Sequence, residues 1–159
     1  GARYVIVGEG PDETKLRELA AACGVADAVV FAGALSDDEI AEAYATADVY
    51  VGLSREAGGK QAEGFGISFV EAAASGTPSV AGDSGGVRSA VRDGETGILV
   101  DPNDPDDAAA AIAELLLDDG RREALGVAGR AAVESYYNWE RVAEETRRLA
   151  RRVVRGERA

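Results

Sequence analysis

Residues 63–81 read EGFGISFVEAAASGTPSVA and contain the strongest indications of the fold in this chain. A loop with two glycines leads into a helical run that begins at Ile67, and a Gly-Thr-Pro turn then opens a short apolar strand at Ser79–Ala81. Short apolar strands that alternate with helices are typical of a parallel sheet covered on both faces. The same stretch carries two carboxylates, Glu63 and Glu71, with seven residues between them.

The alternation continues on both sides of this stretch. Short, valine-rich runs predict four further strands, at Tyr4–Val7, Val29–Phe31, Val49–Leu53 and Ile98–Val100. Helical patterns lie between them, and the last strand is followed only by helices, expected at about 106–117, 121–135 and 139–154. We therefore predict a single α/β domain over residues 1–159: a Rossmann-like, doubly wound parallel sheet with helices on both faces and a helical C-terminal tail.

Local signals place several helix boundaries. Ser36 is the expected N-cap of the helix after the second strand, because three acidic residues follow it and complement the helix dipole. The helix at 139–154 has an apolar face formed by Trp139, Val142, Thr146, Leu149 and Val153. Its paired arginines are interpreted as a solvated face rather than a lipid contact, so we expect no membrane contact from this domain.

Composition restricts the function further. The chain has 159 residues, 29 acidic against 17 basic, and a net charge of -12. A field of that sign disfavours nucleic acid and anionic membranes as partners. Few lysines and many carboxylates would fit a salt-adapted cytoplasm, although a GC-rich genome also favours arginine and alanine. If the chain is salt-adapted, its stability should rise in molar salt.

Two residue types are scarce. Histidine is absent, which excludes a Ser-His triad and histidine metal sites, and no metal is expected. The one cysteine, Cys23, allows no internal disulfide and is expected to be buried in its helix.

Neither a signal peptide nor a membrane-length apolar run is visible, so a cytoplasmic location is expected.

The helix that carries Glu71 is apolar nearly all round, and we expect it to be buried. A buried carboxylate is costly unless it is paired or hydrogen-bonded, which makes Glu71 a candidate for binding a ligand. The alternative is that Glu71 faces solvent or meets an arginine. Gly64 and Gly66 lie at the helix start, where free amides and the helix dipole favour an anion.

Other loops could contact phosphate. A turn with three glycines, Gly82–Gly86, follows a strand and allows close backbone approach, especially at Gly85 and Gly86. The nearest cations to the Glu63 loop are Arg55, which follows Ser54, and Lys60. Each of these segments could equally be an ordinary turn or surface loop.

Gly8 opens a third glycine turn, Gly8-Glu-Gly10, between a strand and a helix. A dinucleotide-binding motif would need a third glycine where Glu13 stands, and an acidic residue near the end of the second strand. Neither is present, so NAD binding is not expected.

The order of these motifs resembles the carboxyl-terminal domain of retaining GT-B glycosyltransferases of group 1, the GT4 family. The residues that carry the resemblance are Ile6–Pro11, Phe31–Gly33, Glu63–Glu71, Gly76–Pro78, Gly85-Gly86, Asp93–Gly97 and Tyr137–Trp139. The resemblance covers about residues 3–150.

The resemblance implies a donor-binding domain that helps to move a hexosyl group from a UDP- or GDP-linked sugar, such as GDP-mannose, with retention and without a metal or other cofactor. Glu71 would hold the ribose hydroxyls, and Glu63 would be catalytic, holding hydroxyls of the transferred sugar with the Phe65-Gly66 amides. Backbone near Gly33 and Leu35 would frame the base. The implied donor-binding residues are Glu63, Gly64, Phe65, Gly66, Ile67, Glu71, Gly33, Leu35, Ser54 and Arg55, with Lys60, Gly8, Gly85 and Gly86 added.

The chain departs from the family pattern in three respects. The family's first βα unit, with its phosphate-binding arginine and lysine, and its N-terminal acceptor domain are not in this sequence. Arg88-Ser89 also stands where the family often has Pro-Glu. We therefore expect this chain alone to bind nucleotide weakly without transferring sugar.

Two other functions remain open from the sequence. A stand-alone nucleotide-binding or regulatory module would use the same glycine loops without catalysis. A glycoside hydrolase would use Glu63 and Glu71 as acid and nucleophile across a scissile bond. The two neighbouring glycines and the parallel topology favour phosphate binding over hydrolysis.

Overall fold

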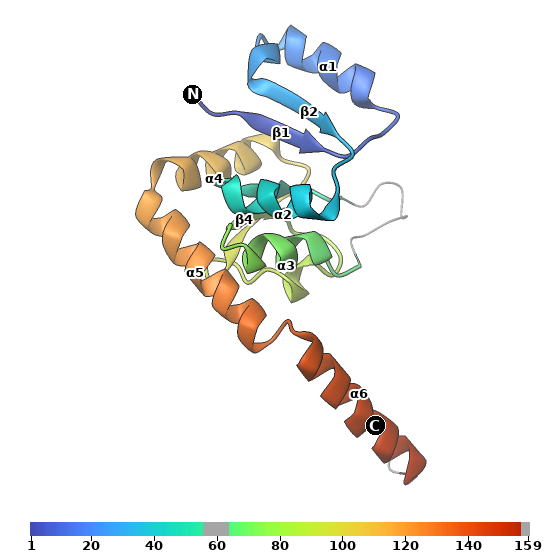
Figure 1. Ribbon diagram of the computed structural model, residues 1–159. Coiled ribbons are helices and arrows are strands. Elements are labelled where there is room, and N and C mark those ends of the chain that lie inside the picture. Colours follow the sequence, from blue (N-terminus) through green and yellow to red (C-terminus); the bar gives the residue numbers. More distant parts are fainter. Residues whose placement is uncertain (56–63, 157–159) are drawn as a thin grey trace. The chain divides into compact units, whose positions relative to one another are not determined.

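The computed structural model describes residues 1–55 and 64–156. It divides into two compact units, Gly1–Ala43 and Tyr44–Ala159, and each is described by itself. The prediction of one domain over the whole chain stays a prediction. Figure 1 labels the helices and strands along the sequence.

The first unit contains a two-stranded parallel sheet. Strand β1 (Tyr4–Val7) pairs with β2 (Val29–Gly33), and helix α1 (Glu13–Ala22) with the short 3-10 helix η1 (Ala26–Ala28) connects them. Most of helix α2 (Asp37–Thr46) follows. Cys23 is exposed rather than buried, because α1 buries only Ala20 along its length.

The start of α2 confirms the predicted cap. Ser36 and Glu39 bond reciprocally: the backbone amide of Ser36 donates to the Glu39 carboxylate over 2.8 Å, and the amide of Glu39 donates to the Ser36 hydroxyl over 3.4 Å. The hydroxyl also donates to the same carboxylate over 2.6 Å. This capping box satisfies two amides that a helix start would otherwise leave free.

The second unit contains a three-stranded parallel sheet in the order β3 (Tyr50–Gly52), β4 (Ser79–Gly82), β5 (Gly97–Val100). Helix α3 (Ile67–Ala74) precedes β4, and the short 3-10 helix η2 (Val87–Ser89) follows it. The helical tail comprises α4 (Pro105–Leu117), α5 (Asp119–Ser135) and α6 (Trp139–Val154).

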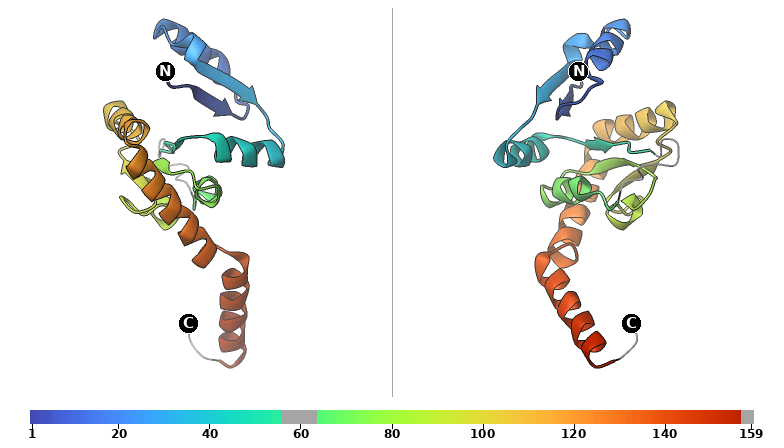
Figure 2. Two further views of the ribbon diagram at one scale, coloured as in Figure 1. Left: turned by 60° about the vertical axis from the view of Figure 1, so that its left-hand side comes forward. Right: turned by 90° about the vertical axis from the view of Figure 1, so that its right-hand side faces the viewer.

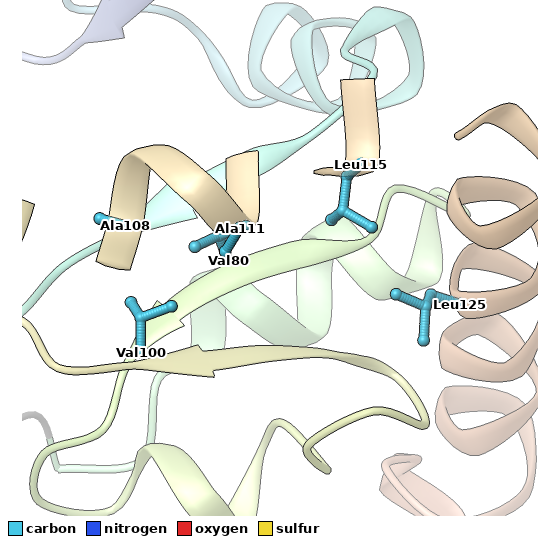
Figure 3. Packing of buried hydrophobic residues seen from close by; sticks show 6 residues of the cluster. All are labelled: Val80, Val100, Ala108, Ala111, Leu115 and Leu125. Atoms are coloured by element: carbon cyan, nitrogen blue, oxygen red, sulfur yellow. The ribbon is translucent and has the colours of Figure 1, made fainter. Parts of the chain in front are cut away.

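The central strand β4 is buried over its whole length and contributes to two cores. Successive residues of a strand point to opposite faces of the sheet. Val80 packs with Val100 and with α4 and α5, through Ala108, Ala111, Leu115 and Leu125 (Figure 3). Ala81 packs on the other face with Phe69 of α3 and with Val87, Ala90 and Val91 around η2. Helices therefore cover both faces of this sheet.

The prediction of an α/β fold with parallel strands and helices on both faces is confirmed. The strands differ from the prediction in forming two sheets instead of one, because no hydrogen-bonded pairing among the described residues links the β1–β2 pair to the β3–β4–β5 sheet.

The last helix, α6, has no buried residue. Figure 2 shows it continuing beyond the end of α5. The apolar residues of its predicted face are exposed: the exposed fraction is 84% for Trp139, 43% for Val142, 49% for Leu149 and 63% for Val153. The amphipathic pattern predicted from the sequence is present, and its apolar side faces solvent in this structure.

Candidate functional site

The start of α3 is a glycine in the left-handed conformation. Gly66 has φ 85° and ψ 57°, values that side-chain-bearing residues rarely adopt, and it immediately precedes Ile67. No side chain of the described residues caps this helix. The first turn of α3 therefore has backbone amides, rather than a capping side chain, at the end that favours negative charge.

The loop after β4 lies against this helix start and also contacts the segment after β3. A Cβ added to Gly86, in the loop after β4, would lie 2.0 Å from the carbonyl oxygen of Gly64. The hydroxyl of Ser84 donates to the carbonyl oxygen of Ser54, just beyond β3, over 2.6 Å. The structure thus brings together Ser54, Gly64, Gly85 and Gly86, which the sequence proposed separately.

The contact between Gly86 and Gly64 was not predicted, and the glycine at position 86 is its one indication in the sequence. Only a glycine allows the backbone at position 86 to approach another carbonyl so closely. The carboxyl ends of parallel strands are also where open α/β sheets bind ligands. The loops after β3 and β4 both leave from such ends.

Phe65 and Ile67 both expose apolar surface. Phe65 is 39% exposed, and its ring lies 6.0 Å from that of Tyr137, centroid to centroid. The Tyr137 hydroxyl donates to the carbonyl oxygen of Ser89 over 2.5 Å, which links the segment before α6 to η2. Ile67 is 67% exposed.

Glu71 is exposed, contrary to the expectation that its helix is buried all round. The helix buries only the face that carries Phe69, Ala72 and Ala73. The physical reason is that the sheet and α5 together cover one side of α3 and leave the other to solvent. The burial argument for ligand binding by Glu71 is therefore wrong. The alternative that Glu71 faces solvent is the one observed.

Glu71 nevertheless has a specific partner. The hydroxyl of Tyr44, in the last turn of α2, donates to Oε2 of Glu71 over 3.2 Å. The sequence analysis did not single out Tyr44. The two residues are 27 positions apart, and no local pattern links them.

Arg88 is a second residue that the sequence analysis did not propose as a ligand. It lies with Gly85 along a polar groove of about 650 Å³ beside the loop after β4, and it forms an ion pair with Asp83. Its signal in the sequence is a cation two residues after Gly86. The groove includes neither Gly66 nor Glu71 among its lining residues.

The remaining predicted residues fall into two groups. Gly8, Gly33 and Leu35 belong to the first unit, where the amide of Gly8 donates to the carbonyl of Gly33 over 2.8 Å. Arg55 is exposed beyond β3. Glu63 and Lys60 lie outside the described residues.

Two features are absent from the described residues. No group of three or more acidic, cysteine or histidine side chains there is arranged to hold a metal ion. Within the same residues, no helix combines the length and apolarity needed to cross a bilayer.

Comparison with known proteins identifies the family. The family "Glycosyl transferases group 1" matches residues 1–132. A GDP-mannose-dependent alpha-(1-6)-phosphatidylinositol monomannoside mannosyltransferase of Mycobacterium tuberculosis is 46% identical over 144 residues, which are 90% of this chain and 37% of that protein. A D-inositol 3-phosphate glycosyltransferase of Acidothermus cellulolyticus is 43% identical over 148 residues, 89% of this chain and 31% of that protein.

Solved structures give the same result. A sucrose-phosphate synthase from Thermosynechococcus elongatus superposes with a TM-score of 0.81 at 31% identity, over 96% of this chain and 39% of its own. The C-terminal domain of a glycosyl transferase group 1 family protein from Francisella tularensis gives a TM-score of 0.76 at 26% identity, over 86% of this chain and 70% of its own.

The chain thus spans between 31% and 37% of the length of these two curated relatives. The family model covers most of the chain, and the family resemblance predicted from the sequence is confirmed. The chain belongs to the group 1 glycosyl transferases.

Proposed function

We propose that this chain is the donor-binding part of a hexosyltransferase that uses a UDP- or GDP-linked sugar, with GDP-mannose the first donor to test. The GDP-mannose suggestion comes from the M. tuberculosis relative, whose name specifies that donor. The observation that carries the proposal is the junction at the start of α3, where Gly64 meets the loop after β4 and Glu71 lies on the exposed side of the same helix.

The chemistry of this junction suits a nucleotide sugar. A carboxylate accepts hydrogen bonds from neighbouring hydroxyls, so an exposed Glu71 can hold the ribose. Amides at a helix start stabilise the negative charge that develops on a departing diphosphate. In this proposal the Phe65-Gly66 amides and Glu63 hold the transferred sugar.

Cations and glycine amides would complete the phosphate site. Ser54, Arg55 and Lys60 follow β3, and Gly85 and Gly86 follow β4. Arg88 is added to this set because it lines the groove beside Gly85. No metal takes part in the proposed binding, and transfer proceeds with retention in the complete protein, which includes an acceptor domain.

The test compares thermal shifts of this chain with GDP, UDP, ADP, NAD and GDP-mannose. A ligand at 100 times its Kd adds about 2.7 kcal/mol to the unfolding free energy. We expect GDP or UDP, and the matching sugar donor, to raise the melting temperature with or without EDTA. Glu71→Ala should reduce that shift, whereas Glu123→Ala, which removes an exposed glutamate of α5, should leave it unchanged.

Two outcomes would contradict the proposal. Stabilisation by NAD alone would indicate a different nucleotide site. Shifts that are the same in Glu71→Ala and in the unsubstituted chain would exclude Glu71 from the site. Rapid sugar transfer by this chain alone would separately contradict the proposed need for an acceptor domain.

A further inference from the structure

We propose that Tyr44 is a positioning residue for Glu71, whose carboxylate it holds in place for the ligand hydroxyls. This inference rests on the proposed function, in which Glu71 contacts the ribose of the donor. It adds a residue from α2, the helix before β3, to a site otherwise built from loops and α3.

The contact is a single directed hydrogen bond. The Tyr44 hydroxyl donates to Oε2 of Glu71 over 3.2 Å. A tyrosine hydroxyl has one hydrogen, so it engages one carboxylate oxygen and does not occupy Oε1. An ionised carboxylate accepts at both oxygens, and the geometry therefore leaves acceptor capacity for a ligand.

Tyr44 is itself fixed at its backbone. The hydroxyl of Thr77 donates to the carbonyl oxygen of Tyr44 over 2.6 Å, and Thr77 is only 4% exposed. Thr77 lies in the turn between α3 and β4. The end of α2 is thus attached to the same turn that follows the helix of Glu71.

The ring of Tyr44 is fixed as well. It contacts Tyr50 of β3 edge to face, with ring centroids 5.4 Å apart, and Tyr50 contacts Phe69 in the same way at 5.4 Å. Phe69 is buried at 2% exposure and belongs to α3, as does Glu71. The contacts therefore connect Glu71 through Tyr44 and Tyr50 to Phe69, which lies on the same helix. Edge-to-face ring pairs of this kind stabilise the position of the Tyr44 ring.

The protonation state of Tyr44 supports a donor role. Burial raises the pKa of the Tyr44 hydroxyl, and the neighbouring Tyr50 and the negative charge of Glu71 raise it further. The hydroxyl therefore keeps its proton well above neutral pH and remains a donor to the carboxylate.

Holding Glu71 in place has a direct consequence for binding. A glutamate on an exposed helix face samples several rotamers, and a ligand must restrict them on binding. Contact with Tyr44 restricts the carboxylate beforehand, so removing the hydroxyl should weaken nucleotide affinity without abolishing it.

The test is a double-mutant cycle on this chain, with GDP and UDP as the probes and Kd measured by calorimetry. Tyr44→Phe removes the hydroxyl and keeps the ring. We expect Kd to rise about three- to tenfold, the range for one lost hydrogen bond. In a Glu71→Ala background the same substitution should change Kd less than twofold, because the hydroxyl acts through Glu71. Tyr136→Phe removes a hydroxyl from an exposed tyrosine outside the proposed site and is the matched control.

A purely structural role would give a different pattern. It would lower the melting temperature of Tyr44→Phe and change Kd equally in both backgrounds, which would overturn the proposal. An unchanged Kd for Tyr44→Phe would also overturn it. If Tyr44→Phe does not fold, Thr77→Val removes the backbone anchor instead and should show the same dependence on Glu71.

The two proposals fail in distinguishable ways. Absence of nucleotide binding by the unsubstituted chain overturns the proposed function, and the role of Tyr44 falls with it. Binding that depends on Glu71 but not on Tyr44 overturns the positioning role alone.

Discussion

Gly126 of α5 lies directly against Gly76, which belongs to the turn between α3 and β4. A Cβ at position 126 would be 2.1 Å from the carbonyl oxygen of Gly76, a distance that requires the backbone to move. The absence of a side chain at this position is what allows α5 to pack on that turn.

Two glycines of α5 should therefore respond oppositely to alanine. Alanine normally stabilises a helix relative to glycine by roughly 0.5–1 kcal/mol. Gly126→Ala should instead lower the unfolding free energy by about 1–3 kcal/mol through overpacking. Gly120→Ala, whose Cβ would meet Asp118 in an ordinary contact at 3.5 Å, should be neutral or stabilising. Urea denaturation measures both, and a stabilising Gly126→Ala would contradict the packing described.

The contact between Gly86 and Gly64 gives a second pair. Gly86→Ala would place a Cβ 2.0 Å from the Gly64 carbonyl oxygen and push the loop after β4 away from the start of α3. If that junction binds nucleotide, Kd should rise about tenfold or more, because small misplacements of binding groups are costly. Gly120→Ala in α5, where the added Cβ would meet Asp118 in an ordinary contact at 3.5 Å, lies outside the proposed site; it is the control and should retain binding. Equal effects of the two substitutions would show that the close contact is not what matters.

The capping box of α2 predicts a pH dependence. The Ser36 hydroxyl, and then its backbone amide, lower the pKa of Glu39 below its ordinary value of 4.5. A carboxylate with a lowered pKa stabilises the fold fully above pH 4.5, and this contribution is lost as pH falls through the lower folded-state pKa. The melting-temperature difference between the unsubstituted chain and Glu39→Gln should therefore shrink as pH falls from 7 to 3. Ser36→Ala should reduce that pH dependence, and a difference that grows in acid would contradict the assignment.

Salt should stabilise this chain. Twenty-nine acidic residues against 17 basic ones produce net repulsion, which added salt screens. We expect the melting temperature to rise between low and molar KCl. A fall would refute the salt-adaptation hypothesis.

Local patterns predicted the elements closely. The strand Tyr4–Val7 and the helix at 139–154 have the predicted bounds, and the helix Ile67–Ala74 begins at the predicted residue. These segments have strong local signals: a valine-rich run, a glycine before a helix, and an asparagine that caps α6 by accepting from the Arg141 amide. Such signals act within a few residues of each other and can be recognised without the fold.

Tertiary relationships could not be predicted in the same way. The pattern of α3 is apolar on nearly every side, so it does not specify which side the sheet covers. The structure exposes Ile67 and Glu71 and buries Phe69. The partnership of Tyr44 with Glu71 and the contact of Gly86 with Gly64 also join residues far apart in the sequence. Such pairs become visible only when the helices and loops are placed on the sheet.

The exposed start of α6 has a practical consequence. Trp139 is the one tryptophan of the chain and is 84% exposed, beside the apolar residues of that helix. Its fluorescence emission therefore reports on a single helix. A blue shift would register a molecule or polypeptide that covers this surface, with no added label.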